Sequence, residues 1–340
     1  MSPPTSAARR LEQVQGQIGR ASTTDDRTTP FPELPFGARY LHLNNATKRN
    51  ALSVAVLQDL RDQLYAYNTS PVDGQARFLP PFEPGLLAEL EKAFYHPDSE
   101  AGRTYGWLVH AKQWNQHRSN LPRVIVLRSA GPVFCSGHDL TEIRAMSHAQ
   151  AKHLFDLCAE VMSLIRRCPV PVIGAMQGLA TAAGAQLALT TDLPVAHAST
   201  PFRLPGSGMG FPCISPVTAV SRKVGNAFGY EMFALAQPHR ADELPGRPLR
   251  VLDDNAPLDL AVGEMVAYYT QRTAAQPQAL GKWAYWTQVG MHAKTSTSTA
   301  DGYEEAAAWA GSAMALLAQT SDAKEGIGAF LDKRKPSWYT

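Results

Sequence analysis

Apolar and polar positions alternate along the chain in short blocks, which predicts strands and helices in succession. Residues 124–127 are wholly apolar, as in a strand buried on both faces, and 170–175 and 193–198 have the same character. Apolar residues recur at helical spacing over 154–165, and small residues fill a helical stretch over 181–191. The alternation predicts an α/β core whose parallel strands are joined by right-handed crossovers.

The same pattern divides the chain into segments. Residues 1–34 have little apolar periodicity, and the α/β core is expected over 35–256. An insertion at 68–121 interrupts this core: prolines break the pattern, and only 85–95 has helical spacing. It is expected to be either a lid over a pocket or a surface excursion. From 257 to 340 no strand signal remains, so we expect a helical C-terminal section.

Composition and charge narrow the class of protein. Hydrophobic residues make up 44% of the chain and charged residues 18%, which is typical of a soluble globular protein. A net charge of +2 without a dense basic cluster gives no support to a nucleic-acid partner. The four cysteines lack the spacing of a zinc site, so no metal is expected, and no apolar run is long enough to span a membrane.

The N-terminal segment has two possible interpretations. Its first 24 residues contain several arginines and serines and a single acid, Glu12. That composition is typical of a mitochondrial presequence, but also of a tail without any targeting role. Mitochondrial and cytoplasmic locations therefore both stay open.

Two segments of small residues offer backbone N–H groups to a ligand. The first carries Ser136 and Gly137 just after a predicted strand, and the second opens a helix at 182–184. N–H groups in the first turn of a helix have no partner inside the helix. Two such groups aimed at one oxygen stabilise negative charge on it, by about 3–4 kcal/mol per donor where measured. The pair suits chemistry beside a thioester carbonyl.

The chain resembles the enoyl-CoA hydratase/isomerase, or crotonase, superfamily. The resemblance lies in residues 44–53, 131–140, 169–192 and 325–338. Within the superfamily, 178–186 and the Pro205-Gly206 pair resemble the enoyl-CoA hydratase domain-containing protein 3 group, which is associated with mitochondria.

The resemblance implies a crotonase fold, a spiral of ββα units, whose C-terminal helices assemble a homotrimer or homohexamer. It implies an acyl-CoA ligand and a place in fatty acid metabolism, with coenzyme A as part of the substrate and no separate cofactor. The backbone N–H groups of Ser136 and Ala183 would hold the thioester oxygen. The implied substrate-binding residues are Lys48, Arg49, Ala51, Ser136, Gly137, His138, Asp139 and Ala183.

Two departures from the family pattern bear on the reaction. Gln186 and Gly206 stand where the hydratases of the family carry two catalytic glutamates. Hydration needs one group to activate water and another to supply a proton, and neither residue here can do so. We therefore expect a lyase- or isomerase-type reaction on acyl-CoA, such as decarboxylation of a malonyl-type thioester, and not classical hydration. A non-catalytic acyl-CoA sensor or scaffold is the alternative.

Several side chains near these loops have more than one interpretation. His138 either titrates near neutral pH in the pocket or faces solvent or a phosphate. Asp139 is expected to accept nearby backbone N–H groups, and Cys135 and Cys213 to be inert buried thiols. A catalytic carboxylate from the insertion also stays open. The sequence does not determine the reaction or the acyl chain.

Overall fold

The computed structural model describes residues 31–291 and 303–340. The expectation of a tail or targeting segment falls largely on residues 1–30, which lie outside this description. The chain forms two compact units. The first comprises residues 31–66, Arg123–Arg166 and Pro171–Gln271, and the second comprises Tyr67–Pro122, Arg167–Val170 and Arg272–Thr340.

Two sheets form the framework of the first unit. The larger is parallel throughout, with the spatial order β1 (Ala38–Leu43), β2 (Val124–Ser129), β4 (Val172–Met176), β6 (Leu193–His197) and β9 (Arg250–Leu252). The smaller has the order β3 (Val133–Cys135), β5 (Leu179–Thr181), β7 (Pro201–Arg203) and β8 (Pro238–Arg240), and only β8 is antiparallel to its neighbour.

Each central strand of the larger sheet is followed by a strand of the smaller sheet and then by helix. The helical elements of this unit are η1 (Ala46–Lys48), α2 (Val54–Ala66), α6 (Leu140–Ala145), α7 (His148–Arg167), α8 (Ala183–Thr190), η2 (Pro205–Met209), α9 (Ile214–Val224), α10 (Asn226–Leu235), η3 (Ala241–Glu243) and α11 (Leu258–Arg272). The successive units β2-β3-α6, β4-β5-α8 and β6-β7-η2 confirm the predicted spiral of ββα units.

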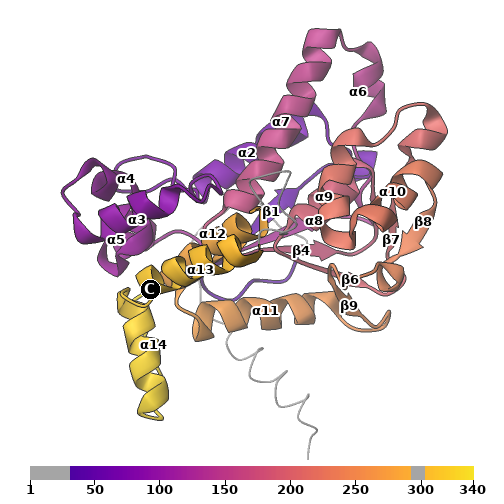
Figure 1. Ribbon diagram of the computed structural model, residues 1–340. Helices are drawn as coiled ribbons and strands as arrows, with labels where there is room; N and C mark the ends of the chain where they lie inside the picture. The colour runs from indigo at the N-terminus through magenta and orange to yellow at the C-terminus, as the bar shows by residue number, and fades with distance from the viewer. Residues whose placement is uncertain (1–30, 292–302) are drawn as a thin grey trace, which may run out of the picture. The chain divides into compact units, whose positions relative to one another are not determined.

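Helices cover both faces of the larger sheet. Figure 1 shows α11 along one face and α8 on the other. Every residue of β2 is buried, which confirms the buried strand predicted from the apolar residues 124–127, and the strand continues through Arg128 and Ser129. Val124 and Val126 pack with Val262 and Val266 of α11. Because side chains alternate along a strand, Ile125 and Leu127 face the opposite side of the sheet. The start of α8 thus lies against the smaller sheet, where the candidate site is formed.

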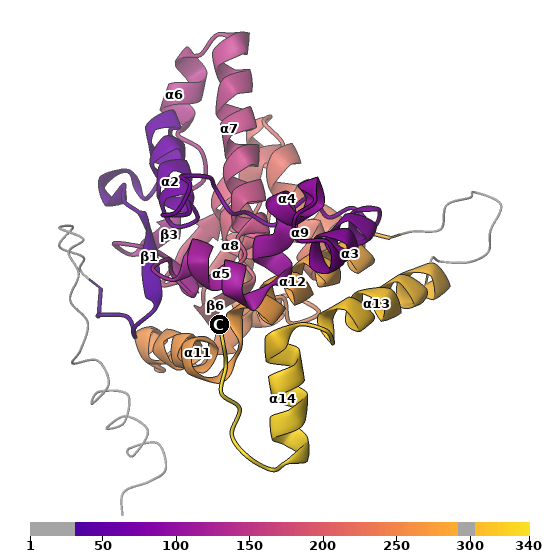
Figure 2. The same ribbon diagram turned by 90° about the vertical axis from the view of Figure 1, so that its left-hand side faces the viewer.

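The second unit is helical. It contains α3 (Leu86–Tyr95), α4 (Glu100–Val109), α5 (Ala111–Arg118), α12 (Ala275–Val289), α13 (Tyr303–Leu317) and α14 (Ser321–Leu331). Figure 2 shows the group α3–α5 and the helices α12–α14 that follow α11 along the chain. Leu90, Trp107 and Trp283 are among the residues of one hydrophobic core that the two groups share.

The segment 68–121 therefore differs from the irregular insertion that its prolines indicated. The expected helix at 85–95 is present as α3, but α4 and α5 follow it. The local pattern concealed α4 because this helix contains Gly102 and Gly106, and glycine disfavours helix interiors. Ser99 caps α4 by accepting the N–H of Gly102. The structure also groups this segment with α12–α14, and α11 with the sheet, whereas the sequence suggested one C-terminal section from 257 onward.

Within residues 31–291 and 303–340, no helix combines the length and the apolar character that a membrane crossing requires.

Candidate active site

A cavity of about 460 Å³ opens in the first unit, where the loop after β3, the start of α8 and the turn from η2 to α9 meet. Among the residues predicted for the site, Ser136, His138, Ala183 and Gly206 line it. Its other walls are Leu140, Phe155, Ala182, Pro205, Met209, Phe211, Pro212, Cys213, Ile214, Ser215 and Pro216. The lining is therefore mainly apolar, as a site for an acyl chain requires.

Close packing at Gly137 brings the two predicted loops together. Gly137 has φ +89°, and a Cβ placed on it would lie 2.8 Å from the Cβ of Ala182 and 3.2 Å from the backbone N of Ala183. Only glycine combines this backbone conformation with so close an approach. The residue does not line the cavity, but it allows the loop after β3 to rest against the first turn of α8.

The backbone N–H groups of the loop after β3 differ in what they contact. That of Ser136 donates to the carbonyl oxygen of Arg49 at 3.1 Å. Leu52 forms a parallel bridge with this loop by donating to Gly137 and accepting from Asp139. The N–H of His138, between these two bonds, has no hydrogen-bond partner in the part of the chain that the structure describes. Ser136 is thus not the free donor that the family resemblance implied.

The corresponding group on α8 is the N–H of Ala183. Ala182 is the N-cap residue, with φ 51° and ψ −124°, so Ala183 begins the helix and its N–H has no acceptor among the described residues. Of the flanking N–H groups, that of Ala182 donates to Arg203 and that of Ala185 donates back to Ala182, while Gly184 does not line the cavity. His138 and Ala183 therefore each bring one free N–H group to the same cavity.

A second hollow, of about 380 Å³, adjoins this loop. Its lining contains Lys48, Ala51, Ser136, His138, Asp139, Leu140 and Thr141. Two predicted binding residues, Arg49 and Gly137, line neither hollow, and the carbonyl oxygen of Arg49 accepts the N–H of Ser136. The structure thus gathers most of the predicted binding residues, while their roles in binding stay predictions.

Asp139 connects the two sides of this second hollow. One carboxylate oxygen accepts the N–H groups of Thr141 and Glu142 and caps α6, which confirms the interpretation of Asp139 as a cap. The other oxygen lies 2.9 Å from Nζ of Lys48. This bond lowers the pKa of Asp139 and raises that of Lys48, so both groups stay charged near neutral pH. The ammonium group is mostly exposed and can also meet an anionic ligand.

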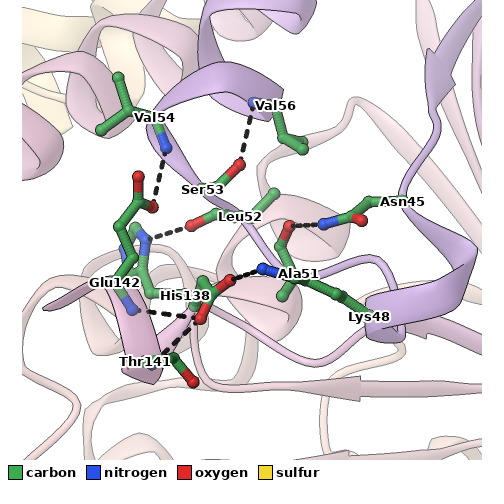
Figure 3. Close-up of polar contacts among 11 residues, drawn as sticks. Asn45, Lys48, Ala51, Leu52, Ser53, Val54, Val56, His138, Thr141 and Glu142 are labelled. Carbon is green, nitrogen blue, oxygen red and sulfur yellow. Dashed lines mark hydrogen bonds and ion pairs between the residues drawn. The ribbon is translucent and has the colours of Figure 1, made fainter. Parts of the chain in front are cut away.

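The His138 side chain faces the protein interior and not bulk solvent. Nδ1 lies 3.4 Å from the carbonyl oxygen of Leu52, and the ring meets Phe155 edge-on at 5.1 Å between centroids. Figure 3 shows the contacts from His138 to Leu52 and from Glu142 to Val54, which tie this loop to the start of α2. Burial lowers the pKa of His138 below its ordinary value of 6.5. The ring is therefore neutral at physiological pH.

The two positions of the family glutamates differ in their surroundings. Gln186 is only 5% exposed, does not line the cavity, and accepts the Ser215 hydroxyl at 3.3 Å between Oγ and Oε1. Gly206 lines the cavity, but a Cβ on it would lie 2.1 Å from the carbonyl oxygen of Phe211. A glutamate at 206 therefore requires the turn at 205–213 to change shape.

The cysteines near the site are protonated thiols. Burial raises the pKa of Cys135 to about 12 and also raises that of Cys213. All four cysteines are buried and free. No group of three or more His, Cys, Asp or Glu residues with metal-binding geometry occurs in the described ranges.

Several residues that line the cavity could not be identified from sequence. Phe155 belongs to α7, one position beyond the apolar face on which Leu154 lies, and no spacing signal distinguishes it. Met209, Phe211 and Ile214 are between 47% and 71% exposed at the cavity. Their apolar character in a turn rich in glycine and proline was the one available signal.

Comparison with known proteins agrees with this fold and site. The model of the family "Enoyl-CoA hydratase/isomerase" matches residues 112–340. The chain belongs to this family. Among its curated relatives, "Enoyl-CoA hydratase domain-containing protein 3, mitochondrial" of Rattus norvegicus is 34% identical over 310 residues, covering 89% of this chain and 81% of the relative. The protein of the same name from Danio rerio is 29% identical over 322 residues, covering 92% and 89%.

Solved structures of the family have the same fold. An enoyl-CoA hydratase of Mycobacterium smegmatis is 31% identical with a TM-score of 0.63, covering 89% of this chain and 96% of that one. The human enoyl-CoA hydratase domain-containing protein 3 is 28% identical with a TM-score of 0.62 and the same coverage. The predicted membership of the family, and the likeness to the domain-containing protein 3 group within it, are thereby confirmed.

Proposed function

We propose that this protein binds an acyl-CoA thioester in the cavity of the first unit and stabilises negative charge on the thioester oxygen. The observation that carries the proposal is the pair of free N–H groups, those of His138 and Ala183, at one apolar cavity. Preorganised N–H donors of this kind stabilise an enolate or related oxyanion. Because Ser136 already donates to Arg49, His138 replaces it in this proposal.

The two hollows suit the two parts of such a ligand. The apolar cavity suits the acyl chain, and the hollow beside Lys48 and Ala51 suits the polar coenzyme A portion. The exposed ammonium group of Lys48 can pair with a phosphate while it keeps Asp139 beside it. We propose fatty acid metabolism as the setting, because acyl-CoA thioesters are among its substrates.

The proposed reaction is of the lyase or isomerase type on the acyl group, and hydration is not part of it. Hydration requires two proton-transferring groups that share a water, whereas Gln186 is an amide behind Ser215 and Gly206 has no side chain. These same two residues favour the alternative function, a non-catalytic acyl-CoA sensor or scaffold.

A matched pair of ligands tests binding of the thioester oxygen. Titration calorimetry would compare butyryl-CoA with its S-butyl thioether analogue, which lacks only the carbonyl oxygen. Two hydrogen bonds contribute about 1–3 kcal/mol together, so we expect butyryl-CoA to bind roughly 5- to 150-fold more tightly. Equal affinities would exclude the two N–H groups as the site of the oxygen, and absence of binding would refute the proposal as a whole.

Turnover separates the enzyme from the sensor. A panel of enoyl-, dienoyl- and malonyl-CoA substrates would be incubated with the protein and the products resolved by mass spectrometry and ultraviolet absorbance. Conversion of any of them supports the enzyme, and tight binding of all without conversion supports the sensor.

We also propose a homotrimer or homohexamer assembled through the C-terminal helices. Ile327, Phe330 and Leu331 of α14 are 53%, 83% and 71% exposed. Their spacing places them on one face of the helix, and apolar faces of this kind mark interaction sites.

A mitochondrial location is the last part of the proposal. The curated relatives from Danio rerio and Rattus norvegicus carry "mitochondrial" in their names, and residues 1–24 have the arginine-rich, acid-poor composition of a presequence. Fractionation of cells expressing the full chain, compared with a chain lacking residues 1–30, would test it.

A further inference from the structure

We propose that the imidazole of His138 is the proton acceptor of this site, and that its Nε2 removes a proton from the carbon next to the thioester carbonyl. The inference rests on the proposed function and adds the catalytic side chain that the missing glutamates leave open. It assigns two roles to one residue, because the backbone N–H of His138 would hold the oxygen on which the negative charge develops.

The composition of the cavity wall points to His138. Among the residues that line the cavity, only His138 and Cys213 have side chains that titrate. The raised pKa of Cys213 keeps its thiol protonated near neutral pH. His138 is therefore the one lining side chain that can accept a proton there, within the residues that the structure describes. Its lowered pKa keeps the ring in the neutral, proton-accepting form.

Hydrogen bonding determines which ring nitrogen is available. A carbonyl oxygen can only accept, so the contact with Leu52 requires Nδ1 to carry the hydrogen. Nε2 is then left with a lone pair, and this atom is buried without a hydrogen-bond partner in the described structure. An unsatisfied buried acceptor is destabilising, which calls for a functional explanation. The lone pair of Nε2 is thereby available to take a proton from a bound substrate.

The ring of Phe155 lies beside the imidazole ring of His138. It packs edge-on against His138, lines the cavity, and has Phe211 as its own neighbour at 6.4 Å. Access of the acyl carbon to Nε2 therefore requires rotation of side chains at this wall. The bond to Leu52 keeps the imidazole in place meanwhile.

The proposed step balances without any further reactant. The lone pair of Nε2 takes the proton, the C–H electron pair becomes the carbon–carbon double bond of an enolate, and the carbonyl electrons move onto oxygen. The protonated imidazole then returns a proton to the same carbon, or to the third carbon beyond the carbonyl when the acyl chain is a 3-enoyl group. The first outcome is exchange of the proton and the second is movement of the double bond.

Exchange into heavy water tests the assignment. The wild-type protein would be incubated with butyryl-CoA in deuterium oxide, and loss of the proton signal next to the carbonyl would be followed by NMR. His138→Gln keeps the backbone N–H but cannot transfer a proton, so we expect exchange to fall at least about 100-fold while affinity changes less than about threefold. His153→Gln, which alters an exposed histidine of α7, is the matched control and should behave as wild type.

A second variant guards against a structural effect. In His138→Ala, added imidazole should raise the exchange rate at least about tenfold if the ring acts as a base. Exchange by His138→Gln at the wild-type rate overturns the inference, and so does binding of butyryl-CoA by the wild type without exchange. Failure of the wild type to bind butyryl-CoA refutes the proposed function instead, so the two failures are distinguishable.

Discussion

At the scale of single residues, the candidate site depends on which backbone and ring N–H groups already have a hydrogen-bond partner within the protein. The N–H of Ser136 is occupied by Arg49, while that of His138 is free, although the two lie in one loop. The His138 ring is neutral because it is buried, and Nδ1 is held by Leu52. Small changes of environment therefore decide which atoms can act on a ligand.

The burial of His138 predicts a pH dependence of stability. The pKa of His138 is lower in the folded protein than its ordinary value of 6.5, so the unfolded chain binds a proton more readily. Stability is therefore fully present above pH 6.5 and is lost as pH falls from there toward the folded pKa. Urea unfolding at several pH values should show a larger loss on acidification for the wild type than for His138→Gln.

The charged groups around the ring do not disturb this comparison. Lys48 pairs with Asp139, and Glu142 accepts the N–H of Val54, in the wild type and the variant alike. Their contributions cancel in the difference. An equal loss of stability in both proteins would contradict the assignment of the effect to His138.

The close packing around Gly206 predicts that placing a glutamate at this position alone does not restore hydration. Because a Cβ at this position meets the carbonyl oxygen of Phe211, Gly206→Ala should destabilise the protein by about 1–3 kcal/mol. Gly208→Ala is the control, since a Cβ there meets no described atom within 4 Å, and it should change stability by less than about 0.5 kcal/mol. Thermal unfolding measures both. Unchanged stability of Gly206→Ala would show that the turn adapts.

At the scale of elements, the site is a contact between the end of β3 and the beginning of α8. Each element brings one free N–H group to the cavity wall, His138 from the loop after β3 and Ala183 from α8. Parallel pairing of β3 with β5 places the two loops at the same edge of the smaller sheet. Gly137 then lets them touch.

This contact predicts that Gly137→Ala impairs binding. Both Gly137 and Gly131 have positive φ, +89° and +82°, so an alanine at either position costs about 1–2 kcal/mol. Only at Gly137 does the added methyl group also press on Ala182, whereas at Gly131 it meets Ala46 at an ordinary 3.6 Å. Butyryl-CoA affinity measured by calorimetry should fall for Gly137→Ala and stay within about twofold for Gly131→Ala. Equal losses would assign the effect to backbone strain alone.

At the scale of the whole molecule, the chain divides into two units with separate hydrophobic cores. One core lies between the larger sheet and α11, and the other joins α3–α5 with α12 and α13. The candidate site lies wholly within the first unit, whereas α14, with its exposed apolar face, belongs to the second. The two units thus carry separate tasks in the proposed assembly.

The exposed face of α14 predicts the effect of a charge on assembly. Phe330→Asp should convert the proposed trimer or hexamer into smaller species, because a carboxylate buried at an apolar interface is strongly unfavourable. Tyr95→Asp, at a 62% exposed aromatic residue of α3, should leave the assembly unchanged. Light scattering after size-exclusion chromatography measures both masses. A wild-type monomer would contradict the proposed assembly.

The sequence by itself determined the central strands β2, β4 and β6 of the larger sheet, the helices α7 and α8, and the family, because these depend on local periodicity and on runs of small residues. The wholly apolar segment 124–127 predicted a buried strand, and the small residues at 182–184 predicted the start of α8. The same signals located both loops of the candidate site before any geometry was known.

Only the tertiary structure decided which groups in those loops are free. The partner of the Ser136 N–H is Arg49, far away along the chain, and the wall beside His138 is Phe155 on another helix. Likewise, α3–α5 are held by apolar contacts with α12 and α13 and not by a pattern of their own. Such contacts arise from long-range packing, which local periodicity does not encode, and they determine which N–H groups a ligand can meet.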